Sequence, residues 1–233
     1  MNQLPPQDLL EIIDQQLLPS LEIESVDSRN PIKVRYLPQP WRLIGKGNYA
    51  VVVYHPHHPD LVVKIYAPNR PGFTEEIEVY RLLGSHPAFS ECLYAKDNFL
   101  VLKRLYGTTL YDCLHQGLSI PKQVIRDIDQ ALEYAQSRGL RPHDVHGRNV
   151  MMYQGRGLVV DISDFLHEEP CSKWNDLKTA YYWFYLPVLS PLRLHVSYST
   201  LDMIRKSYRL LSAVRNSCRQ VLLRLPQWKL FKP

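Results

Sequence analysis

Few features of this 233-residue chain place it in a specialised class of protein. It has four cysteines, and none of them forms a C-x-x-C pair, which argues against a zinc knuckle and against a disulfide framework. We therefore expect reduced thiols, most of them buried, at Cys92, Cys113, Cys171 and Cys218.

Long apolar runs are also missing. The apolar run over residues 179–192 is broken by two prolines and is shorter than the roughly 20 residues that a membrane-spanning helix needs. Near the N-terminus, Asp8, Glu11 and Asp14 interrupt the short apolar stretch that a signal peptide would require. These absences predict a cytoplasmic protein without a transmembrane segment.

Acidic residues are scarce in one part of the chain only. Residues 199–233 contain eight Lys and Arg but one acid, a net charge of +7, so the other residues carry −2 of the total of +5. A helix is predicted over residues 201–223, with apolar residues on one side. Its other faces carry Arg205, Lys206, Arg209, Arg219 and Arg224. Either this helix covers the rest of the protein with a solvated basic face, or it docks to an anionic partner such as acidic lipid, RNA or an acidic protein.

The chain contains a β-rich half followed by a helical half. With 45% hydrophobic residues it can bury the core of one large domain or of two closely packed lobes. Strands are predicted over residues 41–47, 50–55, 60–66, 92–95 and 98–103, with a helix capped by Thr74 over 73–83. Further helices are predicted over 109–115, 121–137 and 174–185, with a hairpin over 150–153 and 158–160. A helix over 7–18 is expected to pack outside the main fold, and a proline-spaced connector follows it.

A glycine-rich loop lies between the first two predicted strands. Residues 45–52 read Gly-Lys-Gly-Asn-Tyr-Ala-Val-Val. Small residues let backbone N–H groups approach phosphate oxygens without an intervening side chain, so Gly45 and Gly47 are candidate phosphate-binding residues. The same glycines are equally typical of a simple hairpin turn.

A lysine, Lys64, interrupts the third predicted strand. Its burial would be costly unless an anion pairs with it. The helix that follows offers Glu75, Glu76 and Glu78, and Glu76 borders the inward stripe because three inward-facing residues follow it at helical spacing. We choose Glu76 as the partner. The alternative for these acids is a solvated first turn that the helix dipole favours.

Two carboxylates and an amide follow in the helical half. Residues 143–149 read His-Asp-Val-His-Gly-Arg-Asn, in which Asp144 can orient a hydroxyl while Asn149 holds a metal ion. A second metal-holding carboxylate is offered by Asp161, which directly ends the apolar strand of the predicted hairpin, or by Asp164. We favour Asp161, because Asp164 would need a longer excursion after the strand.

In this order, the glycine loop, the lysine strand and the Asp/Asn loop resemble those of the protein-kinase-like superfamily, over about residues 41–186. The resemblance implies a two-lobed α+β fold, with an antiparallel β-sheet N-lobe that carries one helix, a mainly helical C-lobe and a reduced activation segment. We expect an N-terminal helix and connector over 1–40, the N-lobe and hinge over 41–107, and the C-lobe with its basic C-terminal helix over 108–233.

The resemblance also assigns roles to individual residues. It implies that ATP lies beneath the glycine loop, with Leu102 as gatekeeper and the adenine hydrogen-bonded to backbone near Lys103 and Leu105. The implied nucleotide-binding residues are Gly45, Gly47, Ala50, Val52, Val62, Lys64, Leu102, Lys103 and Leu105. The implied catalytic residues are Asp144, Lys64 and Glu76, and Asn149 and Asp161 would hold Mg²⁺.

Departures from the kinase pattern bear on regulation and on the substrate. The arginine that usually precedes the catalytic Asp is here His143, and no long activation segment separates Asp161 from Trp174, so control by loop phosphorylation is not expected. His146 replaces a lysine of serine/threonine kinases and is similar to the D-x-H-x-x-N pattern of aminoglycoside-type phosphotransferases. Asp176 resembles an aspartate that braces the catalytic loop, or is a surface carboxylate at a helix start.

The combined expectation is a compact, atypical serine/threonine protein kinase that uses ATP and Mg²⁺ and moves the γ-phosphate to a hydroxyl of a protein substrate. Two alternatives remain open. One is a small-molecule or glycan kinase, which His146 and the missing activation segment favour. The other is an atypical ATPase or a nucleotide-binding accessory subunit of a larger assembly.

Overall fold

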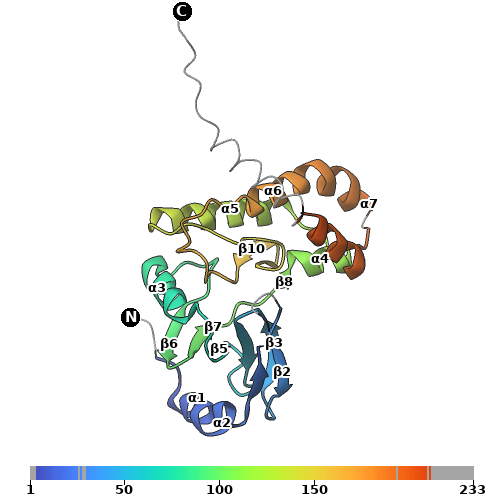
Figure 1. The fold of residues 1–233 in the computed structure, drawn as a ribbon. Coiled ribbons are helices and arrows are strands. Elements are labelled where there is room, and N and C mark those ends of the chain that lie inside the picture. The colour runs from blue at the N-terminus through green and yellow to red at the C-terminus, as the bar shows by residue number, and fades with distance from the viewer. Residues whose placement is uncertain (1–3, 26, 28–29, 193, 209, 211–233) are drawn as a thin grey trace, which may run out of the picture.

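The computed structural model describes residues 4–25, 27, 30–192, 194–208 and 210. The chain forms two lobes, one built on an antiparallel sheet and the other mainly helical (Figure 1). The expected two-lobed α+β architecture is therefore confirmed.

The N-lobe contains a five-stranded sheet in the order β3-β4-β5-β7-β6, and all neighbouring strands are antiparallel. Its strands are β3 (Arg42–Lys46), β4 (Ala50–Tyr54), β5 (Leu61–Tyr66), β6 (Cys92–Lys96) and β7 (Phe99–Lys103). All five lie where the sequence predicts them, because β-branched and aromatic runs alternate with turns rich in Gly, Pro and Asp.

Alternate side chains of this sheet belong to two different hydrophobic cores. In β5, Val63 and Ile65 join one cluster, whereas Val62 and Tyr66 join the other. Because side chains alternate along a strand with a period of two, Lys64 lies on the same face as Val62 and Tyr66. This inner face is turned toward the C-lobe.

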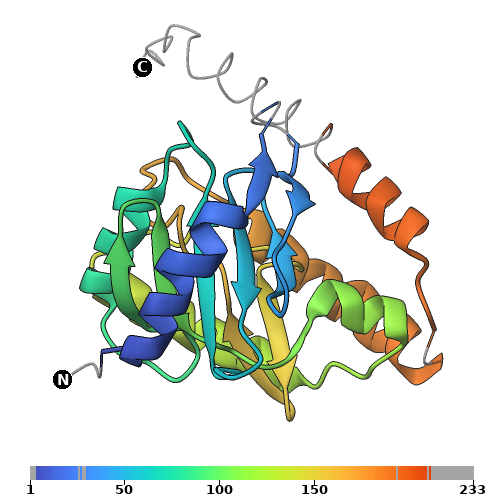
Figure 2. The same cartoon turned by 90° about the horizontal axis from the view of Figure 1, so that it is seen from below.

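The N-terminal helix closes the outer face of the sheet. It consists of α1 (Gln7–Ile12), the π-helical turns η1 (Ile13–Leu17) and α2 (Leu18–Ser20). Leu9, Ile13 and Leu17 are at most 1% exposed and share a cluster with Val51 and Val63, and Figure 2 shows the helix crossing the strands. The prediction that this helix packs outside the main fold is therefore wrong. Its apolar stripe packs against the odd-numbered side chains of the sheet, and the two bury each other.

The connector after this helix contains a hairpin that the sequence did not predict. Strands β1 (Glu22–Glu24) and β2 (Lys33–Tyr36) pair in an antiparallel two-stranded sheet. None of their residues is fully buried. Both strands alternate polar and apolar residues, Glu-Ile-Glu and Lys-Val-Arg-Tyr, but over three and four residues this alternation is a weak signal.

Helix α3 (Phe73–Leu83) has the predicted bounds but a different start. The residue at its N-cap is Gly72 with φ 106°, and no side chain caps the helix, so the predicted cap by Thr74 is wrong. Glycine adopts this left-handed conformation without steric cost. The helix buries Glu76 beside Val79 and Leu83.

The C-lobe begins with β8 (Thr108–Thr109), α4 (Leu110–Gln116) and α5 (Lys122–Ser137). The hairpin β9 (Val150–Tyr153) and β10 (Arg156–Val159) follows, and its β9 strand also pairs with β8. The chain then continues through α6 (Lys173–Ala180), η2 (Tyr181–Leu189) and α7 (Ser190–Leu192). β8 was not predicted, because a two-residue strand has no periodicity.

The start of the predicted C-terminal helix is present, since residues 198–208 are helical. Residues 209 and 211–233 lie outside the described residues, and with them the basic residues Arg209, Arg219 and Arg224. Docking of this helix to an anionic partner therefore stays a prediction.

The described cysteines are free thiols. Cys113 is fully buried but Cys92 and Cys171 are only partly buried, which corrects the expectation that most thiols are buried. Burial raises the pKa of Cys113 to about 11, and Cys218 lies outside the described residues.

In the described part of the chain, no helix is both apolar enough and long enough to span a membrane.

The β9–β10 hairpin is held against α5 by a close backbone approach and a carboxylate. A Cβ atom at Gly157 would lie 2.3 Å from the carbonyl oxygen of Val124, so only glycine fits there. Asp127 of α5 accepts hydrogen bonds from Arg156 Nε at 2.7 Å and from the backbone N–H of Gly157 at 3.0 Å. This junction fixes the hairpin that carries residues 149 and 161 at its two ends.

Hydrogen bonding of this kind predicts a pH-dependent contribution to stability. The hydrogen bonds from Arg156, against the opposing effect of burial, lower the pKa of Asp127 to about 2 from an ordinary value of 3.8. Because the folded pKa is depressed, the stabilisation is complete above about pH 4 and is lost as the pH falls toward about 2. Asp127→Asn should lower the free energy of unfolding by about 1–3 kcal/mol at pH 7, measured by urea denaturation.

The difference between wild type and Asp127→Asn should shrink between pH 4 and pH 2. Glu133→Gln, on the exposed side of the same helix, is the control and should change stability by less than about 0.5 kcal/mol. A difference that stays constant down to pH 2 would show that Asp127 does not act through its charge.

Candidate active site

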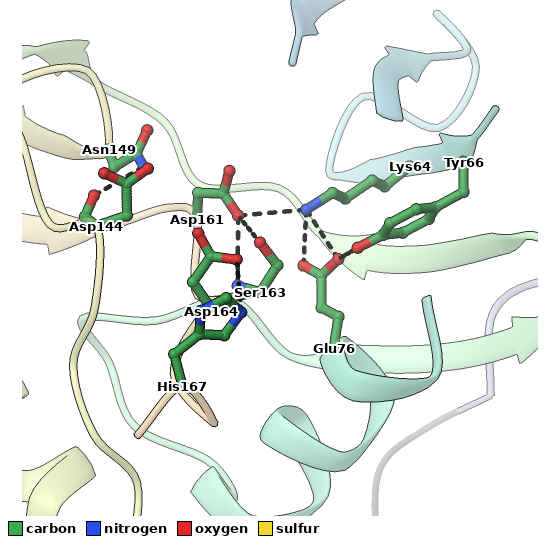
Figure 3. A network of polar contacts seen from close by, with 9 residues as sticks. All are labelled: Lys64, Tyr66, Glu76, Asp144, Asn149, Asp161, Ser163, Asp164 and His167. Atoms are coloured by element: carbon green, nitrogen blue, oxygen red, sulfur yellow. Dashed lines mark hydrogen bonds and ion pairs between the residues drawn. The ribbon is translucent and has the colours of Figure 1, made fainter. Parts of the chain in front are cut away.

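The inner face of β5 brings Lys64 into a buried ion pair with helix α3. Lys64 is 8% exposed and Glu76 is 0% exposed. Lys64 Nζ donates to Glu76 Oε1 at 2.9 Å and lies 2.8 Å from Oε2 (Figure 3). The pairing predicted between the strand and the helix is therefore present, and it removes the cost of burying an unpaired ammonium.

The other two glutamates of α3 lie elsewhere. Glu78 pairs with Arg81 on the same helix at 2.6 Å, and Glu75 is exposed. This distribution follows from helical spacing, since one of the three acids falls on the buried stripe of the helix. It agrees with the reading of Glu75 and Glu78 as solvated residues.

Tyr66 is a partner of Glu76 that the sequence analysis missed. Its hydroxyl donates a short hydrogen bond to Glu76 Oε2 (Figure 3). Tyr66 lies two residues after Lys64, on the same face of β5, and is 2% exposed. Strand periodicity could have identified it, because a tyrosine at this position must find a partner for its buried hydroxyl.

The C-lobe contributes a second carboxylate to Lys64. Asp161 follows β10, and its Oδ1 accepts from Lys64 Nζ at 3.3 Å and from Ser163 Oγ at 3.0 Å. Asp164 lies farther along, where its Oδ1 is 3.6 Å from His167 Nε2. The geometry therefore favours Asp161 over Asp164 as the carboxylate that works with Lys64.

These contacts set the charges of the site. Burial by itself would lower the pKa of Lys64, but Asp161 and Glu76 raise it well above its usual value. Burial would raise the pKa of Asp161, but Lys64 and the hydrogen bonds from Ser163 lower it below its usual range. Burial raises the pKa of Glu76, against the opposing effect of Lys64. Lys64 is thus a cation, and Asp161 an anion, at neutral pH.

The loop of Asp144 and Asn149 lies beside this group (Figure 3). Asp144 has φ 54°, a left-handed conformation that is uncommon outside glycine and is concentrated at functional sites. Asn149 Nδ2 donates to the backbone carbonyl of Asp144 at 3.1 Å and so closes the loop. The backbone N–H of Tyr111 donates to Gly147 O at 2.8 Å and ties the loop to α4.

Asn149 and Asp161 lie next to each other although twelve positions separate them in the sequence. The backbone N–H of Val160 donates to Asn149 O at 3.0 Å, and β9 and β10 pair Val150 with Val159. The amide oxygen of Asn149 points away from Asp144 (Figure 3). Carboxylate and amide oxygens are ligands that Mg²⁺ accepts, so this donor set fits the ion predicted here.

Three or more His, Cys, Asp or Glu side chains do not gather into a metal-holding group among the described residues. An ion at Asn149 and Asp161 would therefore complete its shell with water or with phosphate oxygens, as Mg²⁺ commonly does.

The glycines of the glycine loop border space that the protein does not fill. A Cβ atom at Gly45 would meet nothing within 4 Å, and one at Gly47 would only reach Ala50 O at 3.7 Å. Neither glycine is required by a left-handed backbone or by packing against the rest of the chain. The loop therefore has room for a ligand at its glycines.

The apolar residues predicted to contact a nucleotide share the inner face of the sheet. Ala50, Val62 and Leu102 are buried in the cluster of that face, and Val52 packs partly against it. Val62 pairs with Leu102 across β5 and β7. These four side chains therefore line the same face as Lys64.

The predicted hinge is partly occupied by internal hydrogen bonds. The backbone N–H of Lys103 donates to Glu91 O at 2.9 Å, and Lys103 O accepts from Ser90 Oγ at 2.6 Å. The N–H of Lys103 is thus engaged within the protein, whereas its carbonyl oxygen keeps a second lone pair. Among the predicted hinge contacts, the carbonyl of Lys103 and the backbone of Leu105 fit an adenine best.

Two further contacts at the catalytic loop were not foreseen. Lys173 Nζ makes a very short contact with Asp144 Oδ1. Asp202, from the C-terminal segment, accepts from Tyr111 Oη at 2.9 Å and from Arg148 Nη2 at 3.0 Å. Lys173 and Asp202 are distant in sequence from the residues that they contact, so no local sequence pattern predicts these contacts.

Asp176, in the first turn of α6, accepts hydrogen bonds from Ser172 Oγ at 2.8 Å and from Tyr208 Oη at 2.7 Å. These contacts tie the helix to the C-terminal segment. The bracing of the catalytic loop by Asp176 stays a prediction.

The chain is similar to a bacterial protein that is described as a kinase. A protein of Bacillus subtilis (strain 168) described as "Putative serine/threonine-protein kinase YrzF" is 28% identical to the chain over 165 residues, which make up 70% of this chain and 77% of that protein. The chain has a protein-kinase-like fold. No protein-family model matches it.

Two crystal structures of the Mycobacterium tuberculosis PknI kinase domain also resemble the chain. They have TM-scores of 0.41 and 0.42 and are 23% and 21% identical to it. The alignments cover 55% of this chain and 59% and 60% of those kinase domains, so this kinase-like chain spans about three fifths of their length.

Tyr66→Phe should destabilise the kinase-like fold, because it removes one of the two partners of a buried carboxylate oxygen, Glu76 Oε2, and leaves it with Lys64 alone. We expect a loss of about 1–3 kcal/mol in the free energy of unfolding, measured by chemical denaturation. Tyr106→Phe is a matched control: its hydroxyl also donates to a carboxylate, Asp60 Oδ1 at 2.8 Å, but at an exposed position. A loss no larger than that of Tyr106→Phe would contradict the role of Tyr66.

Proposed function

We propose that the chain is an ATP- and Mg²⁺-dependent phosphotransferase, and more narrowly a compact, atypical serine/threonine protein kinase. The observation that carries the proposal is the meeting of Lys64, Glu76 and Asp161 beside the loop of Asp144 and Asn149. A lysine held by a helix carboxylate, next to oxygen ligands for a metal, is an arrangement that binds and orients phosphates. The similarity to the Bacillus subtilis protein supports the same chemistry.

Each residue has a defined part in this proposal. Lys64 binds phosphate oxygens, and Glu76 keeps its ammonium in place. The open space at Gly45 and Gly47 lets the backbone of the glycine loop approach the phosphates, while the N–H of Gly47 itself donates to Ala50 O at 2.8 Å. Asp144 accepts the proton of the acceptor hydroxyl, or orients that hydroxyl for attack on the γ-phosphate.

Asn149 and Asp161 would hold Mg²⁺. When bound, the ion neutralises charge on the phosphates of ATP and orients them. The adenine would lie against Ala50, Val62 and Leu102, with polar contacts to the backbone of Lys103 and Leu105.

The acceptor is proposed to be a serine or threonine hydroxyl of a protein, by similarity to the Bacillus subtilis protein. A small-molecule or glycan acceptor is the second candidate. The observation that favours it is the short connection over residues 162–172 between Asp161 and α6, in which Ile162 and Phe165 are buried. This connection offers a peptide little surface to bind.

Transfer of label from γ-labelled ATP in a cell lysate tests the proposal and separates the acceptors. Asp144→Ala should lower transfer by about 10²- to 10⁴-fold relative to wild type, because it removes the proton acceptor. Label on protein supports the serine/threonine kinase, and label on small molecules supports the second candidate. ATP consumed without any labelled acceptor would support an ATPase or an accessory subunit instead.

Lys64→Ala and Asp161→Asn should also abolish most of the transfer. Lys96→Ala is the control, since it removes an exposed ion pair with Asp14 at 2.9 Å and should leave turnover unchanged. Unchanged nucleotide binding and turnover in both site variants would overturn the proposed function.

Gly45→Val should weaken ATP binding without weakening the fold. A Cβ atom here meets no atom of the protein within 4 Å, and the valine side chain fills space that the phosphates would need, so we expect a rise of about tenfold or more in the Kd for ATP. Isothermal titration measures the affinity and thermal denaturation the stability. Leu43→Val, an exposed change in the same strand, is the control, and equal affinities in the two variants would exclude a phosphate site at this loop.

A further inference from the structure

Helix α6 is placed so that its first residue reaches the catalytic loop. Its second residue, Trp174, is 7% exposed and donates from Nε1 to Asp129 of α5 at 2.7 Å. Lys178, one turn further on, pairs with the same carboxylate at 2.8 Å. These contacts dock α6 on α5 and thereby set the position of Lys173, which starts the helix.

Lys173 is directed at the reacting end of Asp144. Its Nζ contacts Oδ1, while His146 Nε2 lies 3.9 Å from Oδ2. Among the described Lys and Arg side chains, Lys173 is the one that pairs with Asp144. The two oxygens of this carboxylate are therefore in different environments.

Two histidines and one lysine surround the carboxylate of Asp144, and they differ in the charge that they offer it. Burial lowers the pKa of the His146 imidazole, and Lys173 lowers it further, against the opposing effect of Asp144. Burial likewise lowers the pKa of His143. Lys173 places an ammonium directly against this carboxylate, which must meet a polyanionic nucleotide.

We propose that Lys173 is a positioning residue of the transfer step, an inference that rests on the proposed function. Lys173 holds Oδ1 and so fixes the side chain of Asp144, which leaves Oδ2 to take the proton of the acceptor hydroxyl. The acceptor oxygen then forms its bond to the γ-phosphorus of the nucleoside triphosphate. The bond from that phosphorus to the β–γ bridging oxygen breaks, and its electron pair leaves with the nucleoside diphosphate.

A plain surface ion pair would have different consequences. The side chains of Lys173 and Asp144 are 39% and 29% exposed, and pairs of this kind contribute little to stability. A positioning role, by contrast, acts on the rate, because a small displacement of a catalytic group costs far more in turnover than in folding. The distinction can be measured by comparing kcat with KM and with stability.

Lys173→Met in the full chain should lower kcat by about 10- to 100-fold. The KM for ATP should stay within about twofold of wild type, because the nucleotide is held by other residues. Lys96→Met is the matched control: it also removes a partly exposed lysine–aspartate ion pair, with Asp14 at 2.9 Å, but on the N-lobe, and it should keep kcat. Thermal denaturation of both variants accounts for any loss of folded protein.

Rescue separates positioning from structure. Lys173→Arg should retain much of the activity, because a guanidinium can also hold Oδ1. His146→Lys in the Lys173→Met background should recover at least about tenfold in kcat, since an ammonium at position 146 would hold Oδ2 and leave the equivalent Oδ1 to take the proton.

Three results would count against the inference. Wild-type kcat in Lys173→Met, together with a measurable transfer activity, would overturn it and leave the proposed function standing. An equal loss in Lys96→Met, or no recovery from His146→Lys and from Lys173→Arg, would reduce the contact to a structural ion pair. Absence of transfer by the wild-type chain, with Asp144→Ala indistinguishable from it, would overturn both proposals.

Discussion

The buried ammonium of Lys64 is the constraint on which the rest of the site depends. An unpaired charge at 8% exposure would cost several kcal/mol, so the sheet, the helix and the C-lobe all have to bring oxygen atoms to it. Helix α3 supplies Glu76, which is held from its other side by Tyr66. The C-lobe supplies Asp161. Removing one of these groups leaves the others uncompensated, which ties the two lobes together electrostatically as well as by packing.

The C-lobe meets this constraint through a rigid hairpin. Gly157 lets the backbone of β10 approach α5, and Asp127 binds the same segment by its carboxylate. With the hairpin held in this way, Asn149 and Asp161 lie side by side at its open end, and the loop of Asp144 leads directly into it. The kinase-like arrangement thus depends on a few local contacts: those of Gly157 and Asp127 hold the hairpin, and the hairpin in turn positions the loop of Asp144.

Much of this could be predicted from residue patterns. The strand period identified β5 and the face on which Lys64 lies, and the helical period of α3 selected Glu76 among three acids. Tyr66 follows the same strand rule and could have been found. Lys173 could not, because its contact with Asp144 depends on the angle at which α6 docks on α5. The hairpin of β1 and β2 was also missed, since its strands are three and four residues long and so short an alternation is a weak signal.

The sequence by itself determined the order and type of the elements and the residue types that could bind phosphate and metal, because periodicity, turns and side-chain chemistry are local properties of the chain. Only the tertiary structure decided which of these groups meet. The N-terminal helix became part of a second core, Asp161 rather than Asp164 reached Lys64, and an ammonium from α6 reached Asp144. Such contacts depend on how elements far apart in the sequence pack together, and packing is set by the shape of the whole core rather than by any one segment.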